Sequence, residues 1–277
     1  MPNQPLPKII RWLLKVNSVD EMWYKMLTEG DPMTRNGRHL HALIPSNPRC
    51  AACYTPFGGF GGTLGRLGIY LSRPSAKNPR FCTVCDSFNT KYVGGAEVVL
   101  TMLFVDVRGS TTLAEKMNAT EFGHLMNRFY EAATEVLIRA DAFIDKFVGD
   151  EVIGLFIPGF AGQEHARRGV EAAQALLRVT GHGNPSGPWL PVGAGVHTGV
   201  AYVGAVAGVG GTAADFTALG DNVNITARLA SKAGPGEVLI SEATCQAARL
   251  ETERLEKRDL ELKGKSEFVS VRVLRAG

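Results

Sequence analysis

Residues 97–111 read EVVLTMLFVDVRGST, and the fold follows from this stretch. An apolar run leads directly to an acid, Asp106, and a turn of small residues comes after it. An apolar run of this length that is bounded by a turn is typical of a buried strand. We therefore expect a strand over residues 97–107 with Asp106 at its end.

Strand and helix patterns alternate on the C-terminal side of this strand. They predict a helix over 120–140 with Thr120 as its N-cap, a hairpin of strands 142–147 and 152–157, a helix over 163–180, strand, turn and strand over 190–206, a helix over about 221–233, and strands at 237–240 and 268–274. Two helices that follow strands, with hairpins between them, indicate an α+β sandwich. We expect a mostly antiparallel sheet with helices on one face.

The N-terminal third has a different composition, rich in Pro, Gly and Arg. Residues 1–92 hold 12 Lys and Arg against 5 Asp and Glu, whereas residues 93–277 hold 18 against 22. A basic surface can meet an acidic partner, an anionic membrane or nucleic acid, although a solvated surface is the commoner reason for such charge. Helical spacing over 9–27 predicts an amphipathic helix, which could touch a membrane, dock on the rest of the chain or pair with its twin.

Length and composition place the chain among soluble globular proteins. It has 277 residues, of which 45% are hydrophobic and 21% charged, so one or two domains are expected. No apolar run reaches the ~20 residues of a membrane span, and the N-terminus lacks the features of a secretory signal. A cytoplasmic location follows as an expectation. The Gly-rich stretch over 56–65 follows no strand and is interpreted as a mobile connector.

Two acids stand where chemistry on phosphates is possible. The turn after Asp106 exposes backbone N–H groups that can seat phosphate oxygens. Asp150 lies at the tip of the predicted hairpin. If the strands are neighbours, both carboxylates meet at one edge and can bridge a pair of Mg²⁺ ions. Taken singly, each Asp is an ordinary turn or loop-capping residue.

Asn224 and Arg228 are four residues apart on the predicted helix over 221–233, so they share one face, and Asp221 is suited to capping its first turn. An Asn in mid-helix is a poor helix former, and an Arg on an otherwise apolar surface needs an anion. A surface salt bridge would explain the Arg but not the Asn beside it. Together with the two acids, this pair indicates a site for a nucleoside triphosphate and metal ions.

Five motifs in order across the C-terminal part resemble the catalytic domain of the class III nucleotidyl cyclases, the adenylate and guanylate cyclase family. They are LFVDVRGST (103–111), FIDKFVGDEV (143–152), VGAGVHTGVAYVG (192–204), FTALGDNVNITARL (216–229) and LKGK (262–265). The resemblance implies a ferredoxin-like cyclase fold and a homodimer that builds its active sites at the interface. Together with the change of composition near residues 86–96, it predicts a helical segment (1–30), a cysteine module (31–92) and a cyclase catalytic domain (93–277).

The resemblance also implies roles for particular residues. Asp106, Asp150 and the Val107 carbonyl of one protomer would hold two Mg²⁺ or Mn²⁺ ions, with the turn of Gly109, Ser110 and Thr111 near the phosphates. The partner would supply Asn224 and Arg228 to the ribose and the α-phosphate, and Lys146 and Thr217 to the purine. Lys263 matches the family lysine that meets the terminal phosphates. In-line attack of the 3'-hydroxyl would then yield the 3',5'-cyclic nucleotide.

A lysine and a hydroxyl at positions 146 and 217 favour adenine, since they can donate to N1 and accept from the N6 amino group. Guanylate cyclases of the family carry Glu and Cys at these positions, so ATP is the expected substrate. Thr217 departs from the commoner Asp, and Ser110 stands where many members have Phe. A regulatory homologue that has lost turnover remains an alternative, although its usual sign, loss of a metal Asp or of the Asn and Arg pair, is missing.

Four of the five cysteines form two CxxC pairs, Cys50/Cys53 and Cys82/Cys85. Four thiolates in two tight knuckles suit tetrahedral Zn²⁺, and an iron–sulfur cluster could use the same ligands. His39 and His41 lie nearby but are not needed as ligands, while Cys245 and His197 are expected in the core. The module lacks a recognisable reading helix, so no nucleic-acid partner is expected.

Overall fold

The computed structural model describes residues 6–7, 11, 14–67, 73–76, 78–207, 214–261 and 268–276. These residues form two compact units, each of which is described by itself. The first unit comprises Met1–Val98, Pro158–Gly162 and Tyr202–Leu219, and the second comprises Val99–Ile157, Gln163–Ala201 and Gly220–Gly277. Among the described helices, none combines the length and the hydropathy that a bilayer span requires.

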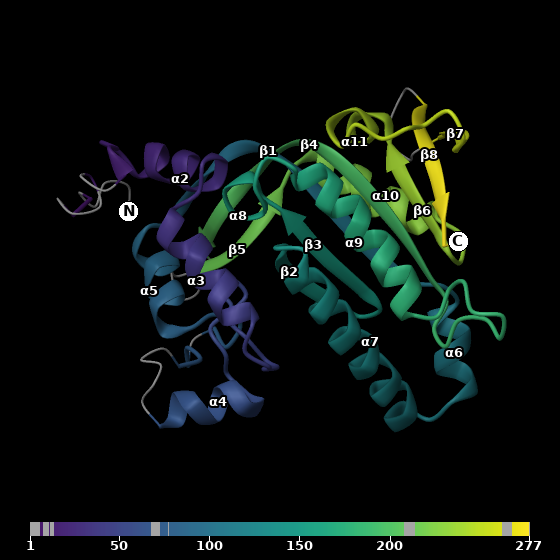
Figure 1. Ribbon diagram of the computed structural model, residues 1–277, viewed down its shortest axis with the longest axis horizontal. Helices are drawn as coiled ribbons and strands as arrows, with labels where there is room; N and C mark the ends of the chain where they lie inside the picture. The colour runs from purple at the N-terminus through teal and green to yellow at the C-terminus, as the bar shows by residue number, and fades with distance from the viewer. Residues whose placement is uncertain are drawn as a thin grey trace. The chain divides into compact units, whose positions relative to one another are not determined.

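The second unit holds most of a sheet with the strand order β2-β3-β1-β4-β6-β8-β7 (Figure 1), although the first residues of β1 and the last residues of β4 belong to the first unit. Its strands are β1 (Gly94–Val107), β2 (Phe143–Val148), β3 (Glu151–Phe156), β4 (Val192–Ala207), β6 (Glu237–Ser241), β7 (Glu256–Leu260) and β8 (Val269–Arg275). β3 pairs antiparallel with β1 and β2, and β8 pairs antiparallel with β6 and β7, whereas β4 and β6 are parallel. The predicted α+β class with a mostly antiparallel sheet is confirmed.

Two long helices of the second unit cover one face of this sheet. They are α7 (Ala119–Arg139) and α9 (His165–Val179). A Cβ added at Gly154 of β3 would lie 2.8 Å from the Leu137 side chain of α7, and one added at Gly169 of α9 would lie 2.8 Å from the Thr101 side chain of β1. Glycine at both positions therefore allows the helices to approach the strands closely.

Helix α10 (Asp221–Lys232) lies on the opposite face. Thr226 of α10 donates a hydrogen bond to the Met102 sulfur, 3.9 Å away, and Met102 points away from the face that carries its neighbour Thr101. The expectation of helices on one face therefore holds for α7 and α9 but not for α10. Because residues 100–105 of β1 are buried without interruption, both faces of the strand require a cover.

Two predicted boundaries differ from the structure for local reasons. Asn118, rather than Thr120, is the N-cap of α7, because Asn118 and Glu121 hydrogen-bond each other's backbone N–H in a capping box. Residues 190–206 hold one long strand, β4, rather than strand, turn and strand. The strand continues through Gly204, where a Cβ would lie 2.3 Å from the Gly94 carbonyl oxygen, so glycine allows the two backbones to approach closely.

The first unit contains the helices α2 (Val19–Thr28), α3 (Pro32–Ala42), α4 (Gly59–Arg66), α5 (Thr83–Lys91) and α8 (Pro158–Ala161), and the strand β5 (Ala214–Leu219), which pairs antiparallel with the end of β4. The prediction of one helix over 9–27 is wrong in its described part. Lys15 has a φ of 51°, and Ser18 caps a new helix by accepting a hydrogen bond from the Glu21 N–H. Ile9, Trp12 and Leu13 of the predicted apolar stripe lie outside the described residues.

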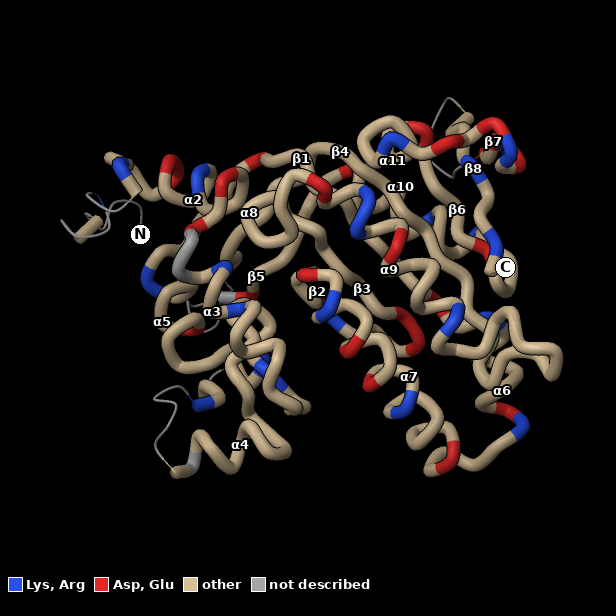
Figure 2. Tube along the Cα trace, viewed as in Figure 1, with Lys and Arg blue, Asp and Glu red and all other residues tan. Residues whose placement is uncertain are grey.

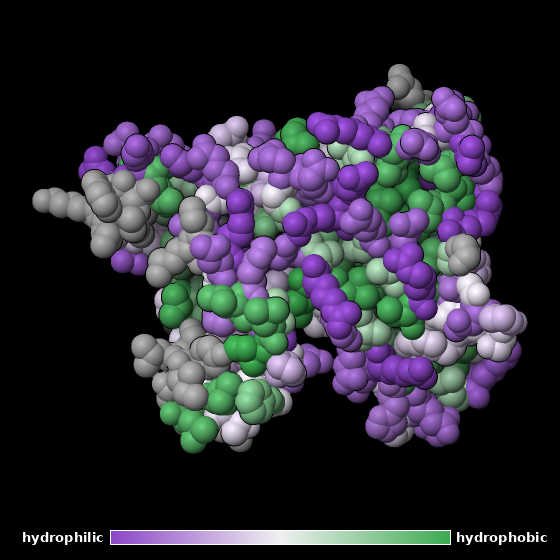
Figure 3. Space-filling view, viewed as in Figure 1, coloured by the Kyte–Doolittle hydropathy of each residue, from purple (hydrophilic) through white to green (hydrophobic). Residues whose placement is uncertain are grey.

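The Gly-rich stretch over 56–65 forms most of helix α4 and is not a mobile connector. Its glycines permit close packing, because a Cβ at Gly61 would lie 2.4 Å from the Pro56 side chain. Apolar surface gathers over this helix (Figure 3), where Phe60 is 65% exposed and Leu67 is 72% exposed. The basic N-terminal third therefore also carries an apolar surface.

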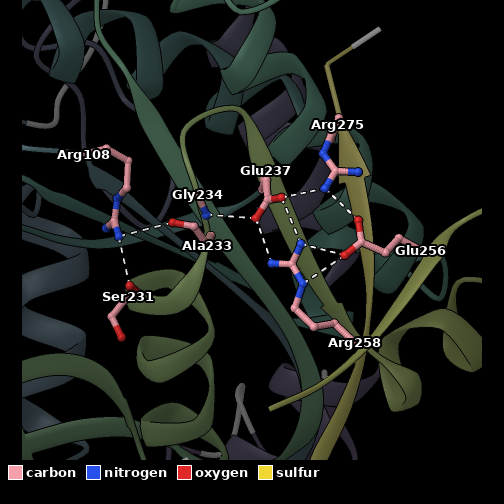
Figure 4. A network of polar contacts seen from close by, with 8 residues as sticks. All are labelled: Arg108, Ser231, Ala233, Gly234, Glu237, Glu256, Arg258 and Arg275. Atoms are coloured by element: carbon pink, nitrogen blue, oxygen red, sulfur yellow. Dashed lines mark hydrogen bonds and ion pairs between the residues drawn. The ribbon is translucent and has the colours of Figure 1, made fainter. Parts of the chain in front are cut away.

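Lys and Arg residues are interspersed with Asp and Glu residues along β6, β7 and β8 (Figure 2). At the centre of Figure 4, Glu237 of β6 accepts hydrogen bonds from Arg258 at 3.0 and 3.1 Å and from Arg275 at 2.8 Å. Glu237 also accepts one from the Gly234 N–H, 3.0 Å away in the turn that ends α10. The hydrogen bonds from Arg258, above all, lower the pKa of Glu237 to about 2. This network therefore connects the end of α10 to the strands β6, β7 and β8.

The variant Glu237→Gln tests how much this network stabilises the fold. The pKa of Glu237 is lower in the folded chain than its ordinary value of 4.5. The contribution of its carboxylate to the free energy of unfolding is therefore complete above pH 4.5 and is lost as the pH falls towards 2. We expect the variant to lose about 1–2 kcal/mol of unfolding free energy at pH 7, since Arg275 is exposed and screened. Urea unfolding at pH 7 and pH 3 measures the difference, which should shrink at the lower pH.

The matched control for this change is Glu253→Gln, at an exposed position of the connection between α11 (Glu242–Ala247) and β7. It should alter the unfolding free energy by less than about 0.5 kcal/mol at either pH. An equal loss for both variants, or a loss for Glu237→Gln that does not change with pH, would contradict the role given to this carboxylate.

Candidate active site and cysteine metal centre

Asp106 and Asp150 meet at one edge of the sheet, as the sequence predicts. Asp106 is the penultimate residue of β1, and Asp150 occupies the turn between β2 and β3. The antiparallel register pairs Asp106 with Glu151, and the Val107 N–H donates to the Asp150 carbonyl oxygen over 3.1 Å. Backbone pairing therefore holds the two acids as neighbours, whatever their side chains bind.

The edge carries a concentration of negative charge that the sequence did not fully reveal. Burial raises the pKa of Asp106, and Asp150 adds to the effect, whereas the Arg108 guanidinium opposes it. Burial and then repulsion from Asp106 and Asp150 raise the pKa of Glu151 to about 7. A cluster of carboxylate oxygens that repel one another is a donor set that suits a hard divalent cation. Glu151 was missed because its closeness to Asp106 depends on the β1–β3 register.

Arg108 connects this edge to the C-terminal end of α10. Its guanidinium forms an ion pair with Asp106 and donates to the carbonyl oxygens of Ser231, 3.0 Å away, and Ala233, 3.4 Å away (Figure 4). The last carbonyls of a helix lack partners within the helix, so they are natural acceptors for a cation. Arg108 lies inside the quoted motif but received no role from the sequence, because the two carbonyls that it contacts at the end of α10 are more than 120 residues away.

Helix α10 carries Asn224 on its exposed side and Arg228 half-buried. Ile225 and Leu229, on the other side of the helix, pack against β6 and β8 in an apolar cluster, which fixes the rotation of α10. The Arg228 Nη1 atom is shielded from solvent and has no hydrogen-bond acceptor among the described residues. A buried cationic donor without an acceptor costs free energy, and an anion would supply the missing partner.

The start of α10 differs from the prediction in one respect. Asp221 is the first helical residue, and the N-cap is Gly220, which has a φ of 139° and offers no side-chain cap. Asn222, in the first turn, instead hydrogen-bonds the Val200 carbonyl and the His197 ring, at 2.7 and 2.8 Å. His197 is buried, as expected of a core histidine.

The remaining predicted nucleotide residues lie in separate parts of the structure. Lys146 is in β2 of the second unit, next to a bulge at Asp145, and its Nζ lies 3.7 Å from the Asp145 carboxylate. Thr217 is buried in β5 of the first unit, opposite Gly204. Lys263 lies outside the described residues.

The turn after Asp106 has the expected local shape. Gly109 adopts a φ of 70°, which favours glycine, and stands at the N-cap of α6 (Ser110–Lys116). Ser110 and Thr111 open this helix, and the Leu113 N–H donates to the Gly109 carbonyl over 2.9 Å. The backbone therefore turns sharply beside the acidic edge.

The four cysteines of the two CxxC pairs converge in the first unit. Their four sulfur atoms all lie within 4.8 Å of one another, and they belong to Cys50, Cys53, Cys82 and Cys85. The Cys53 and Cys82 sulfurs are 3.7 Å apart. Zn–S bonds of about 2.3 Å in a tetrahedron separate the sulfurs by about 3.8 Å. The cluster therefore has the ligand type and the spacing of a tetrahedral metal centre.

Backbone N–H groups support these sulfurs, as they do in metal knuckles. The Cys82 N–H donates to the Cys50 sulfur over 3.3 Å, and the Cys85 N–H donates to the Cys82 sulfur over 3.4 Å. The His41 ring contacts the Cys53 carbonyl at 2.8 Å, so it contacts a ligand's backbone rather than the sulfur cluster. Cys245 is buried in α11 within the second unit, as predicted.

Comparisons with known proteins find similarity over the C-terminal part of the chain. Residues 96–274 match the family described as the adenylate and guanylate cyclase catalytic domain. The adenylate cyclase of Anabaena cylindrica is 29% identical over 188 residues, which is 64% of this chain and 37% of that protein. Among solved structures, the guanylyl cyclase Cya2 is 30% identical with a TM-score of 0.56, over 67% of this chain and 96% of that one. The adenylyl cyclase CyaB from P. aeruginosa is 29% identical with a TM-score of 0.55, over 65% and 96%.

The variant Gly195→Ala tests whether close packing on β4 positions α10. A Cβ at this position would lie 2.4 Å from the Ala230 backbone nitrogen and 2.8 Å from the Leu229 Cβ, both in α10. Because a helix backbone cannot yield as a flexible side chain does, we expect a loss of about 1–3 kcal/mol of unfolding free energy. Urea unfolding measures it.

Gly123→Ala in α7 is the matched control, since an added Cβ there meets nothing within 4 Å. Removing a helical glycine should leave the stability unchanged or raise it by up to about 1 kcal/mol. If Gly195→Ala behaved like Gly123→Ala, the packing of α10 on β4 would not be what fixes this helix.

Proposed function

Because this chain belongs to the adenylate and guanylate cyclase catalytic domain family, we propose that it converts ATP into 3',5'-cyclic AMP and pyrophosphate at sites shared across a homodimer. One observation carries the proposal: a buried guanidinium nitrogen of Arg228 lacks an acceptor among the described residues, in a unit that also carries a pair of acids at one sheet edge. A triphosphate with bound cations would satisfy both. The chain spans 37% of the length of its Anabaena relative, so its activity is proposed here in its own right.

The acidic edge would hold two Mg²⁺ or Mn²⁺ ions. Asp106, Asp150 and the Val107 carbonyl offer the hard oxygen ligands that these ions prefer. When bound, the ions lower the pKa of the ribose 3'-hydroxyl and neutralise charge on the departing pyrophosphate. Arg108, which pairs with Asp106, also donates to the end of α10 and would keep that helix in place.

In the proposed dimer, Asn224 and Arg228 act on the nucleotide that is held by the partner's acids. The Asn224 amide would orient the ribose, so that the 3'-oxygen lies in line with the bond to the leaving pyrophosphate. The fixed fork of Arg228 would donate to the α-phosphate oxygens as charge develops on them. The 3'-oxygen would then bond to the α-phosphorus, and the bond from the α-phosphorus to the oxygen that bridges it to the β-phosphorus would break. That oxygen leaves with pyrophosphate, and the hydroxyl proton passes to solvent.

The purine would be read by Lys146 and Thr217, and Lys263 would meet the terminal phosphates beside the turn of Gly109, Ser110 and Thr111. A lysine donor and a hydroxyl acceptor match the N1 and N6 positions of adenine. Guanylate cyclase activity is the second candidate, favoured by the 30% identity to a guanylyl cyclase of known structure. Use of ATP in a cell fits the cytoplasmic location that the sequence predicts.

The first test compares product formation from ATP and from GTP with Mn²⁺. We expect cyclic AMP to be the main product of the unaltered protein. Arg228→Ala should lower kcat by about 10²-fold or more, because it removes a preorganised donor to the transition state. The control is Arg167→Ala on α9, where the guanidinium is 57% exposed in an ion pair with Glu171, and this variant should keep full activity.

Mixing two inactive variants tests the shared site. Asp106→Ala and Arg228→Ala chains each lack one half of the proposed machinery, and a heterodimer of the two retains one intact pocket. Activity should therefore return on mixing, up to about one quarter of the unaltered value for random pairing of equal amounts. Verified heterodimers that remain inactive would overturn the proposed division of the site, and absence of any product from either nucleotide would overturn the cyclase assignment.

We also propose that the cysteine cluster holds a structural Zn²⁺. Four sulfurs at tetrahedral spacing, two of them from fully buried cysteines, match a closed zinc site without an open coordination position. This centre would belong to the N-terminal module predicted over residues 31–92, ahead of the catalytic domain predicted over 93–277.

Elemental analysis of the purified protein should find about one zinc per chain. Cys53→Ser should lose most of it, because three thiolates and a hydroxyl bind the ion far more weakly, whereas Cys245→Ser should retain it. Iron with matching acid-labile sulfide, or no metal in freshly purified protein, would contradict the zinc assignment.

A further inference from the structure

The strand that carries Thr217 is contacted on one face by the cysteine module and on the other by helix α2, which packs against that module. Phe216 precedes Thr217 in β5, and Asp215 precedes Phe216, so Asp215 and Thr217 share one face while Phe216 points to the other. All three residues belong to the first unit, together with the four cysteines. The contacts of Asp215 and Phe216 therefore determine how Thr217 is held.

On the first face, Arg80 donates to the Asp215 carboxylate over 2.7 Å. Arg80 stands two residues before the cluster ligand Cys82, and its carbonyl accepts a hydrogen bond from the Ala51 N–H, 2.9 Å away and next to Cys50. The guanidinium that holds Asp215 is thus attached to both cysteine knuckles through the backbone. With 34% and 46% of the two side chains exposed, the pair is accessible and can be altered without opening the core.

On the second face, Trp23 of α2 packs against Phe216, with ring centroids 5.8 Å apart. The same indole meets Phe88 edge to face at 5.5 Å and donates from Nε1 to the Tyr92 carbonyl over 2.9 Å. Phe88 lies in α5, the helix that starts directly after Cys82 and contains Cys85. Phe216 is therefore connected to helix α5 and its Cys85 through the buried Trp23 and the half-buried Phe88.

We infer that Arg80 and Trp23 are positioning residues for Thr217, so that the metal-bearing cysteine module sets how tightly this protein binds the purine. The inference rests on the proposed function, in which Thr217 reads the base. Neither residue touches the nucleotide in this account. Loss of either the Arg80–Asp215 ion pair or the Trp23–Phe216 contact lets β5 shift. The contact of Thr217 with the base then weakens, whereas the contacts of other residues with the phosphates persist.

The experiment separates the base from the phosphates. Arg80→Gln and Asp215→Asn are assayed for KM with ATP, for KM with GTP, for kcat and for inhibition by pyrophosphate, a probe without a base. We expect KM for ATP to rise about two- to fivefold in each variant, which is the range for loss of an exposed ion pair. The inhibition constant of pyrophosphate and kcat should stay within twofold, and the preference for ATP over GTP should narrow.

Rescue and controls exclude a general loss of structure. Exchanging the charges, with Arg80→Asp and Asp215→Arg in one chain, should restore KM to within twofold of the unaltered value. Two further variants should raise KM for ATP but leave the inhibition constant of pyrophosphate unchanged. They are Trp23→Phe, which keeps an aromatic ring in the core, and Cys53→Ser, which removes a proposed metal ligand. Arg167→Gln, which breaks an exposed ion pair on α9, should change none of these quantities.

The outcomes distinguish this inference from the proposed function. An unchanged KM for ATP, or an equal shift for pyrophosphate, would overturn the inference while leaving the cyclase intact. If the unaltered protein used GTP or made no cyclic nucleotide, the proposed function would fail. In that case, calorimetry would measure the affinity of the same variants for ATP, GTP and pyrophosphate. A loss of affinity for the nucleotides but not for pyrophosphate would support the inference, and an equal loss would overturn it.

Discussion

Like-charged carboxylates placed side by side are the constraint around which the second unit is organised. The antiparallel pairing of β3 with β1 and β2 brings Asp106, Asp150 and Glu151 to one edge, where burial and the neighbouring carboxylates raise the pKa values of Asp106 and Glu151. The backbone alone maintains this closeness, and Arg108 offsets part of the charge. An arrangement that costs free energy when empty is suited to a site that binds cations.

Helix α10 shows how the same unit prepares the opposite charge. Its buried side is fixed by Ile225 and Leu229 against β6 and β8, and its end is held by Arg108. Glu237, through Gly234, ties the turn after α10 to the arginines of β7 and β8. With both rotation and position fixed, Arg228 keeps a shielded donor nitrogen without an acceptor among the described residues. Preorganisation of this kind avoids reorganisation during a reaction.

The cysteine module has a part in the structure beyond holding a metal. Its residues Arg80 and Phe88, the latter through Trp23, reach opposite faces of β5. Such contacts join segments that are more than 100 residues apart in sequence. They connect a predicted structural centre to the strand whose Thr217 is the proposed reader of the base, which gives a physical reason for the two segments to occur in one chain.

The sequence by itself determined the strands and helices with strong apolar periods, the family, and the identity of the acids, the Asn and Arg pair and the four cysteines, because residue type and spacing carry that information locally. The predictions from sequence were wrong for the Gly-rich residues of α4, for the turn expected within β4, and for the N-cap of α7, which is Asn118 rather than Thr120. Only the tertiary structure decided that α10 lies across the sheet from α7, that Glu151 joins the acidic edge, and that Arg108 and Arg80 have distant acceptors. Those facts depend on register and long-range packing, which bring together residues that no local pattern relates.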